Sequence, residues 1–242
     1  MRTNKTNTAS DLLSQFQVVH YNKKSDNKMK NEKKYDKDSL WRTFLSKFNE
    51  IHGKKLMLSE ESITNLSVIF YYFLKEKKFF ESVNLRKDIS KPSFDKGLLI
   101  IGGYGLGKTD FFKVFEAVFN VYPDLRFKFF TAKGLVRDFE KCQTPFDKEH
   151  FFKKTERKQL FIDDINSEQE ASNYGKKDVI EEILYNRYDY RLRTFVTCNY
   201  TNSDNCAIRT LEDLGKRYGG RIYDRLFEMF NIIEFKGRSI RN

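Results

Sequence analysis

The sequence has no long apolar run. No stretch approaches the about 20 apolar residues that a membrane-spanning helix needs, and the polar N-terminus has no apolar signal-peptide core. Cysteine is scarce, since Cys142, Cys198 and Cys206 are the only three and show no paired metal-ligand spacing. We therefore expect reduced thiols in a reducing compartment, a cytoplasmic location and no membrane partner. No internal repeat is present.

Aromatic residues and positive charge, by contrast, are abundant. The 242 residues include 24 Phe and 13 Tyr, and 39% of the chain is hydrophobic, which is enough for a packed interior. A chain of this length is expected to form one main core with a smaller appendage. The 45 Lys and Arg exceed the 34 Asp and Glu and give a net charge of +11. This excess favours a polyanionic partner such as nucleic acid; the lysine bias of an AT-rich genome is the alternative source.

The chain changes character near residue 39. Residues 1–38 are polar and mix both charge signs, so we expect a mobile arm there. Within this arm, 11–19 is a segment that can dock as a short helix or strand.

Helical spacing of apolar residues follows the arm. It covers 39–53 and 59–80, each opened by a serine in the N-cap position. We expect these two segments to form a small helical N-terminal module over 39–95, with Pro92 marking its boundary.

Short strand-like runs alternate with helical patterns from residue 96 onward. This alternation predicts parallel βαβ units in a three-layer α/β domain over 96–242. The five expected strands cover 98–101, 125–130, 160–162, 194–197 and 231–235. The expected helices cover 110–121, 132–142, 147–155, 178–190 and 211–229, the last with a break near Gly219 and Gly220.

A glycine-rich stretch, GGYGLGKT, follows the first expected strand and precedes a helix. Its spacing is that of the phosphate-binding P-loop. Glycines let successive backbone N–H groups converge on phosphate oxygens, and the helix N-terminus adds favourable partial charge. We expect Lys108 to meet the β- and γ-phosphates of a nucleotide and Thr109 to ligate Mg²⁺. The expected nucleotide-binding residues are Gly102, Gly103, Tyr104, Gly105, Leu106, Gly107, Lys108 and Thr109.

An acidic pair ends another expected strand, in the stretch QLFIDDIN. A P-loop enzyme holds its Mg²⁺ with help from an acid at the end of a parallel strand, and Asp163 is the candidate for this role through water. Asp164 is then expected to orient or deprotonate the attacking water. A strand ending in Asp is common, so the pair gains its meaning from the P-loop.

Asn199 follows a β-branched and aromatic strand, in the stretch RTFVTCNYT. If this strand lies between the P-loop strand and the acidic strand, the Asn199 amide points at the γ-phosphate and the attacking water. An ordinary turn-forming Asn is the alternative.

Arg221 and Arg225 lie four residues apart and so share one face of an expected helix. An arginine presented to a neighbouring subunit's γ-phosphate is an arginine finger, which acts only when subunits assemble. The alternative is a surface salt bridge, Arg225 with Glu228 or Arg221 with Asp224.

Together these residues resemble the AAA+ ATPase domain of DnaC-type helicase loaders and their IstB-like relatives. The resemblance covers residues 96–241 and rests on KGLLIIGGYGLGKT, LFIDDIN, EEILYNRYDYRLRTFVTCNYT, RYGGRIYDRLFEMF and FKGRSIR. It implies a five-stranded parallel sheet with the strand of Asn199 between the two Walker strands. It also implies Lys108 and Thr109 in Walker A, Asp163 and Asp164 in Walker B, Asn199 as sensor 1 and Arg225 as the finger in trans.

Two features depart from common AAA+ patterns. Tyr104 and Leu106 replace the small residues usual in this loop, which bears on the turnover rate. The last expected strand ends shortly before residue 242, so we expect no C-terminal lid domain, as is typical of helicase loaders.

The resemblance implies an Mg²⁺-dependent ATPase that acts in DNA replication as a helicase loader, encoded by a host, phage or mobile element. It implies a replicative hexameric helicase bound through the N-terminal module, single-stranded DNA bound by the ATPase ring, and self-association through Arg225. Two alternatives stay open. One is an IstB-like transposition helper that acts on duplex DNA, and the other is an adaptor that binds ATP with negligible turnover.

A candidate DNA surface lies between the second and third expected strands. Lys133, Arg137 and Lys141 have helical spacing, and the stretch DKEHFFKKTERK follows them. Basic residues next to Phe151 and Phe152 suit a surface that tracks a nucleic-acid backbone and stacks bases. The alternative is one solvated face and one core face, with both phenylalanines in the core.

Overall fold

The computed structural model describes residues 35–56, 59–172 and 175–240. The chain divides into two units, Met1–Asp36 and Lys37–Asn242. Nearly all of the expected arm at 1–38, including 11–19, lies outside the described residues. The second unit begins with helix α2 (Lys37–His52).

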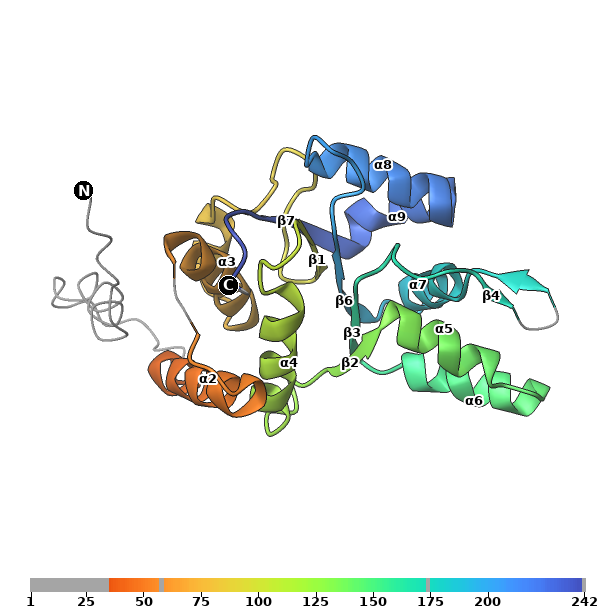
Figure 1. Ribbon diagram of the computed structural model, residues 1–242, viewed down its shortest axis with the longest axis horizontal. Coiled ribbons are helices and arrows are strands. Elements are labelled where there is room, and N and C mark those ends of the chain that lie inside the picture. The colour runs from red at the N-terminus through yellow and green to blue at the C-terminus, as the bar shows by residue number, and fades with distance from the viewer. Residues whose placement is uncertain (1–34, 57–58, 173–174, 241–242) are drawn as a thin grey trace, which may run out of the picture. The chain divides into compact units, whose positions relative to one another are not determined.

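Five parallel strands form the central sheet, in the order β2-β3-β6-β1-β7 (Figure 1). They are β1 (Gly97–Gly102), β2 (Lys128–Thr131), β3 (Gln159–Asp163), β6 (Arg193–Cys198) and β7 (Phe230–Phe235). The predicted five-stranded parallel sheet is confirmed, with the strand that leads into Asn199 paired to β1 on one side and β3 on the other. The second strand starts three residues later than expected, because the N–H groups of Leu125 and Arg126 bond to the Tyr122 carbonyl in a turn.

Helices cover both faces of this sheet, which confirms the predicted three-layer α/β fold (Figure 1). One face carries α2, α3 (Glu60–Phe73) and α4 (Lys108–Phe119). The other carries α5 (Ala132–Glu140), α6 (Pro145–Thr155), α7 (Val179–Asp189), α8 (Ala207–Tyr218) and α9 (Gly220–Met229). The expected break between α8 and α9 is confirmed, and Gly219 makes it with a left-handed φ of 86°.

The helix expected over 59–80 is shorter than predicted: α3 ends at Phe73, Lys75 adopts a left-handed φ of 52°, and a 3-10 turn, η2 (Lys77–Glu81), follows. The sequence pattern also did not indicate a short antiparallel pair, β4 (Ala171–Ser172) with β5 (Lys176–Lys177), which precedes α7. Such short pieces carry too few residues for a hydrophobic period to be read.

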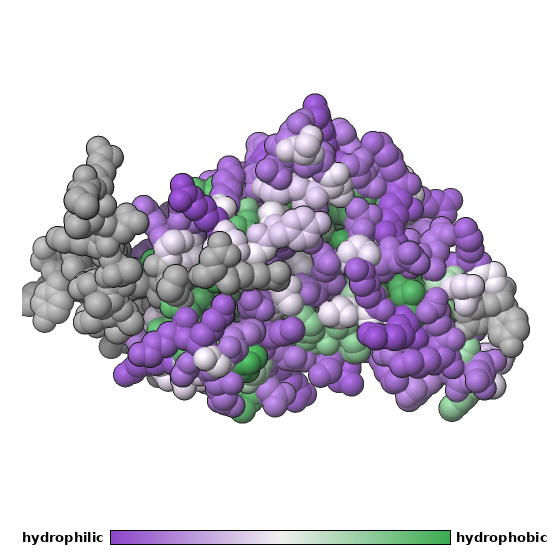
Figure 2. Space-filling model, in the orientation of Figure 1, coloured by the Kyte–Doolittle hydropathy of each residue, from purple (hydrophilic) through white to green (hydrophobic). Residues whose placement is uncertain are grey.

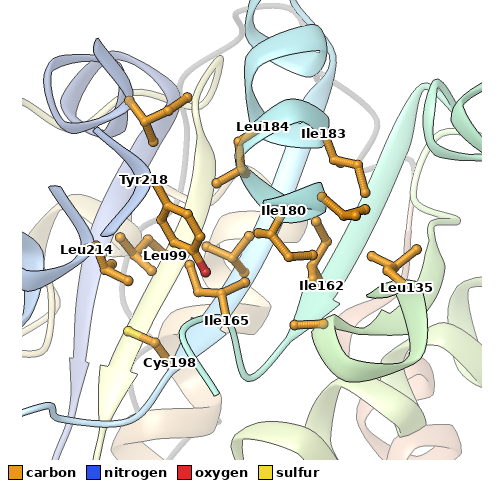
Figure 3. Packing of buried hydrophobic residues seen from close by; sticks show 14 of the residues in the cluster. Leu99, Leu135, Ile162, Ile165, Ile180, Ile183, Leu184, Cys198, Leu214 and Tyr218 are labelled. Carbon is orange, nitrogen blue, oxygen red and sulfur yellow. The ribbon is translucent and has the colours of Figure 1, made fainter. Parts of the chain in front are cut away.

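Each face of the sheet has its own kind of core. Strand β1 is buried along its whole length, as expected for a parallel strand between two layers. On the side of α7 and α8 the core is mainly aliphatic, and Leu99 and Ile162 lie near Ile180 and Leu214 there (Figure 3). On the side of α4 it is mainly phenylalanine, with the rings of Phe112 and Phe161 stacked at 4.2 Å between centroids.

The N-terminal helices share the phenylalanine core. Phe44 of α2 lies 4.7 Å from Phe115 between ring centroids, and Phe73 of α3 lies 5.2 Å from Phe195 of the central strand β6. The segment expected as an N-terminal module, 39–95, is thus packed directly against the sheet, and no separate core divides it from the rest of Lys37–Asn242.

Polar residues dominate the face of the molecule that Figure 2 draws. Hydrophobic residues show there as separate small areas. Within the described ranges, no helix combines the length and the apolar composition needed to cross a bilayer.

Candidate functional site

The glycine loop connects the end of β1 to the start of α4. Gly105 and Gly107 adopt left-handed φ values of 77° and 81°, which a side chain would strain. A Cβ on Gly102 would stand 2.8 Å from the Phe235 carbonyl oxygen, so the loop is also closely packed. Helix α4 begins at Lys108, and the first-turn N–H groups of a helix lack intrahelical acceptors. They are available to an anion at this end of α4.

Lys108 is folded back onto this loop. Its Nζ donates to the carbonyl oxygens of Gly102 and Gly103 at 2.6 and 2.7 Å, and to Oδ1 of Asn199 at 2.9 Å. The residue is only 7% exposed. The P-loop lysine and the amide at the end of β6 are therefore in direct contact.

Asp163 lies beside Thr109 at the end of β3. Thr109 Oγ1 donates to Asp163 Oδ2 at 2.9 Å, and Thr197 Oγ1 donates to Asp163 Oδ1 at 2.6 Å. Burial raises the pKa of Asp163, and the two hydroxyl hydrogen bonds oppose that shift by stabilising the carboxylate. Thr197 was not predicted from the sequence, although its place near the end of β6, two residues before Asn199, was a signal.

Asp164 faces the same space as Asn199. Asn199 Nδ2 donates to Asp164 Oδ1 at 2.6 Å, and the Asp164 N–H is held by Thr197 Oγ1 at 2.9 Å. Asp164 has a φ of 58°, a left-handed conformation that is uncommon outside glycine and frequent at functional turns. The structure thus brings both acids and Asn199 to the P-loop.

These groups enclose a pocket of about 210 Å³. Its lining residues are Tyr104, Gly105, Leu106, Gly107, Lys108, Thr109, Asp110, Asp163, Asp164, Thr197 and Asn199. Tyr104 is the most exposed large hydrophobic side chain of this lining, at 78%.

The oxygen donors of this pocket fit Mg²⁺. That ion prefers oxygen ligands and is usually held by one or two carboxylates together with substrate phosphates. Thr109 and Asp163 supply a hydroxyl and a carboxylate in contact with each other. No group of three or more His, Cys, Asp or Glu able to hold a metal occurs in the part of the chain that the structure describes. An ion here would need the phosphates of a nucleotide.

Arg225 lies outside this pocket. Its guanidinium carbon is 4.2 Å from the ring centroid of Tyr185 and 4.3 Å from that of Tyr188, both on α7. Its Nη2 forms an ion pair with Asp189 at 3.5 Å. The alternative from the sequence was an ion pair between Arg225 and Glu228. Its buried Nη1 has no hydrogen-bond partner among the described residues. The structure does not bring Arg225 to the chain's own P-loop, so its action in trans stays a prediction.

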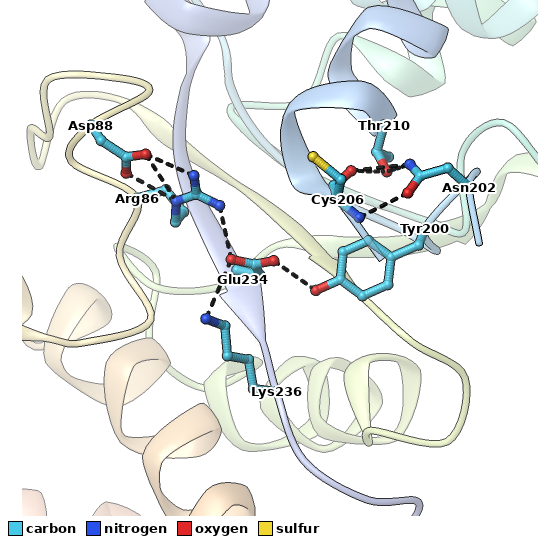
Figure 4. A network of polar contacts seen from close by, with 8 residues as sticks. All are labelled: Arg86, Asp88, Tyr200, Asn202, Cys206, Thr210, Glu234 and Lys236. Atoms are coloured by element: carbon cyan, nitrogen blue, oxygen red, sulfur yellow. Dashed lines mark hydrogen bonds and ion pairs between the residues drawn. The ribbon is translucent and has the colours of Figure 1, made fainter. Parts of the chain in front are cut away.

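A polar network supports the residue next to Asn199. Tyr200 donates its hydroxyl to Glu234 of β7 at 2.8 Å, and Arg86 donates to the other oxygen of the same carboxylate at 2.9 Å (Figure 4). Arg86 in turn pairs with Asp88 at 2.7 Å. The turn after β6 is therefore tied to the edge strand of the sheet.

A second polar chain holds the loop after Asp164. The Asn166 N–H donates to the Tyr218 hydroxyl at 2.9 Å, and that hydroxyl donates to Glu168 at 2.6 Å. Arg217 pairs with the same carboxylate at 2.8 Å and with Asp178 at 3.2 Å. The acidic loop is thereby fixed to the end of α8, directly before the helix that carries Arg225.

The segment after β7 crosses the phosphate loop. The Ile240 N–H donates to the Gly105 carbonyl at 2.9 Å, and Asn65 of α3 donates to the Lys236 carbonyl at 2.9 Å. A Cβ on Gly105 would meet Ser239 Oγ at 2.4 Å, and one on Gly107 would meet Ile240 Cδ1 at 2.8 Å. The glycines are required here by a close approach as well as by their backbone angles.

The expected DNA surface on α5 and α6 has its phenylalanines in the interior. Phe151 is 4% exposed, and its ring lies 5.5 Å from that of Phe139 between centroids. Phe152 packs against the same core. This confirms the alternative in which the two rings belong to the core. On this surface, only the basic side chains can then contact an anion.

Comparison with known proteins finds similarity in fold. No family model matches the sequence, and no curated protein does. Among solved structures, the DnaC helicase loader is 24% identical, with a TM-score of 0.48 over 71% of this chain and 87% of that one. DnaI is 24% identical, with a TM-score of 0.42 over 60% and 73%. AMPPCP-bound DnaA from Aquifex aeolicus is 15% identical, with a TM-score of 0.45 over 69% and 49%.

Proposed function

We propose that the protein is an ATP-dependent helicase loader of DNA replication, which binds a replicative hexameric helicase and single-stranded DNA. The observation that carries the ATPase part is the pocket where Lys108, Thr109, Asp163, Asp164 and Asn199 meet. The loader part is supported by the sequence motifs that surround these residues.

In this proposal the loop and the N-terminus of α4 hold the phosphates of ATP through backbone N–H groups. Thr109 and Asp163 would hold Mg²⁺, which would supply positive charge against the negative charge that develops on the phosphates. Lys108 exchanges the neutral carbonyls of Gly102 and Gly103 for phosphate oxygens. The Lys108 ammonium is attracted more strongly to negatively charged phosphate oxygens than to neutral carbonyls, which favours this exchange.

The movement of Lys108 also changes the contacts of Asn199, which holds Asp164. When Lys108 turns to the phosphates, it releases Oδ1 of Asn199, while Nδ2 of that amide still holds Asp164. Asp164 and Asn199 then orient the attacking water, and Asp164 accepts its proton. Arg225 of a neighbouring subunit supplies positive charge to the transition state, so hydrolysis depends on assembly.

Replacing Lys108 with alanine is expected to lower kcat for MgATP by about 10²- to 10³-fold, the usual loss when one charge-stabilising donor is removed. Phosphate release by the purified protein is the measurement. Lys91→Ala is the matched control, because the Lys91 side chain is exposed and does not line the pocket. Turnover in a folded Lys108→Ala variant equal to that of the native protein would show that the glycine loop is not the nucleotide site.

The partner is tested by capture from cells of the native host in the presence of ATP and Mg²⁺. We expect the replicative helicase to be retained by the native chain, and to be lost with Lys108→Ala or without ATP. Recovery of a transposase together with duplex DNA would support the transposition helper instead. Absence of both helicase binding and DNA-stimulated hydrolysis in the purified protein would contradict the loader hypothesis.

A further inference from the structure

A second pocket lies at the amino ends of the strands, whereas the nucleotide site lies at their carboxyl ends. Its volume is about 910 Å³, near the upper end of the roughly 300–1,000 Å³ typical of ligand sites. Strands β2 and β3 begin here, at Lys128 and Gln159, whereas the P-loop pocket lies where β1 and β3 end. Helix α4 contributes lining residues to both pockets, Lys108 and Thr109 to the P-loop pocket and Glu116 to this one.

The charges around this pocket are almost all positive. One acidic side chain, Glu116, is among the lining residues, against six basic ones: Lys47, Lys113, Arg126, Lys128, Arg157 and Lys158. Lys128 pairs with Glu116 at 3.2 Å, and Lys47 pairs with Glu50 at 2.7 Å.

Four of these cations, Lys113, Arg126, Arg157 and Lys158, have no acidic partner among the described residues. Arg126, Arg157 and Lys158 are exposed, and their side chains form no ion pair or hydrogen bond within the described ranges. Four neighbouring positive charges that no carboxylate neutralises favour an anionic ligand.

Apolar side chains lie among the cations. Ile51 is 41% exposed, and Ala117, Pro123 and Phe127 also line the pocket. Proteins that bind single strands combine a positive groove along the backbone with aromatic side chains on which bases stack. This pocket offers the positive groove, whereas its aromatic lining residue, Phe127, is 7% exposed and packs in the core.

The basic segments are fixed from inside the protein. Arg187, fully buried, donates to the carbonyl oxygens of Arg157 at 3.0 Å and Arg193 at 2.6 Å. Gln159 donates its amide to the Asp124 carbonyl at 2.6 Å, which joins the start of β3 to the turn before Arg126. Positions held in this way reduce the entropy lost on binding.

We propose that this pocket binds the phosphate backbone of a single-stranded nucleic acid. The cations come from α2, α4, the turn before β2 and the loop before β3, a spread that suits successive phosphates better than one nucleotide. The identity of the ligand rests on the single-stranded DNA partner in the proposed function. The inference places the binding site for that DNA in this pocket, not on α5.

The test compares two triple variants that remove the same charge. Arg126→Gln/Arg157→Gln/Lys158→Gln changes the pocket, and Lys133→Gln/Arg137→Gln/Lys141→Gln changes the exposed face of α5. The probe is a fluorescent oligothymidylate of about 16 nucleotides, the upper site size of common single-strand modules. Anisotropy is measured over a series of salt concentrations, with non-hydrolysable ATP present.

The pocket variant is expected to reduce the slope of log K against log salt by about 2, since each phosphate contact on a single strand contributes about 0.7. The α5 variant is expected to keep the native slope. Equal losses in both variants would overturn the proposal in favour of general charge attraction, and loss in the α5 variant alone would move the site to α5.

Three competitors identify the ligand class: thymidine monophosphate, a duplex and polyglutamate, each at equal anionic charge. The proposal expects unlabelled oligothymidylate to compete best. Equal competition by the monophosphate, the duplex or polyglutamate would overturn it in favour of a small phosphate ligand, duplex DNA or an acidic protein, respectively.

Failure of the inference and failure of the proposed function are distinguishable. If the native protein binds the probe through other residues, the loader hypothesis stands and the pocket assignment is wrong. If the native protein does not bind the probe at all, both the pocket assignment and the DNA part of the proposed function fail, while the Lys108-dependent ATPase is measured separately.

Discussion

Replacing Arg225 with alanine is expected to lower assembly-dependent ATP hydrolysis by about 10³- to 10⁵-fold, the range attributed to arginine fingers. ATP affinity should stay unchanged, because Arg225 lies outside its own chain's P-loop pocket. For Arg225 to act in trans it must leave Tyr185 and Tyr188, and its unsatisfied Nη1 makes a negatively charged partner favourable. Phosphate release as a function of protein concentration is the measurement.

Two variants on the same helix serve as controls for Arg225. Arg221→Ala removes an exposed arginine one turn earlier and should retain the native rate. Arg225→Lys keeps the charge but loses the planar guanidinium, so it should recover little activity. Thermal unfolding of each variant separates loss of the finger from loss of the packing on the two tyrosines.

Mixing experiments give a direct readout of action between subunits. Arg225→Ala and Lys108→Ala are each expected to be inactive alone. In a mixture, a Lys108→Ala subunit donates its intact Arg225 to the intact P-loop of an Arg225→Ala subunit, so hydrolysis should partly return. Native turnover in Arg225→Ala alone would refute the finger assignment, and no recovery in the mixture would place Arg225 in a role within its own chain.

Replacing Asp164 with asparagine is expected to lower kcat by about 10²- to 10⁴-fold, the usual share of a general base. ATP binding should persist, because Lys108 and the loop remain. The side chain keeps its shape but loses the negative charge that now accepts from Asn199. The protein should therefore accumulate in its ATP-bound state, measured by the ratio of retained ATP to released phosphate.

Glu170→Gln is the matched control for Asp164→Asn, because it removes one negative charge from an exposed position on the same connection after β3. It should leave kcat unchanged. The functional readout then separates two hypotheses. Helicase release should fail in Asp164→Asn if hydrolysis drives a switch, whereas unchanged function would support the adaptor that turns ATP over negligibly.

The sheet, and the site residues around Lys108 that come from a single chain, were predictable because short stretches of sequence indicate them. Continuous apolar runs bounded by turns predict buried parallel strands, and the P-loop spacing leaves few alternatives for the residues around Lys108. The position of the Asn199 strand followed from the family resemblance, and the pairing of β6 with β1 and β3 agrees with it.

Other features depend on contacts between distant segments and have no local signal. The packing of Phe44 and Phe73 on the sheet is one, since their helical spacing shows a buried face without showing what covers it. The approach of Ile240 to Gly105 and the placement of Arg225 between two tyrosines are others. The start of the second strand was predicted three residues too early, because a run with β propensity does not reveal where strand pairing begins.

The bond from Asn166 to Tyr218 provides a natural probe of the acidic loop. The Asn166 amide hydrogen is donated to a side-chain hydroxyl on α8, and that tyrosine is only 1% exposed. Its exchange with deuterium therefore requires the loop to part from α8, a local opening that does not need the whole domain to unfold. The exchange rate of this single amide would report, without any attached label, how firmly the acids are held in each nucleotide state.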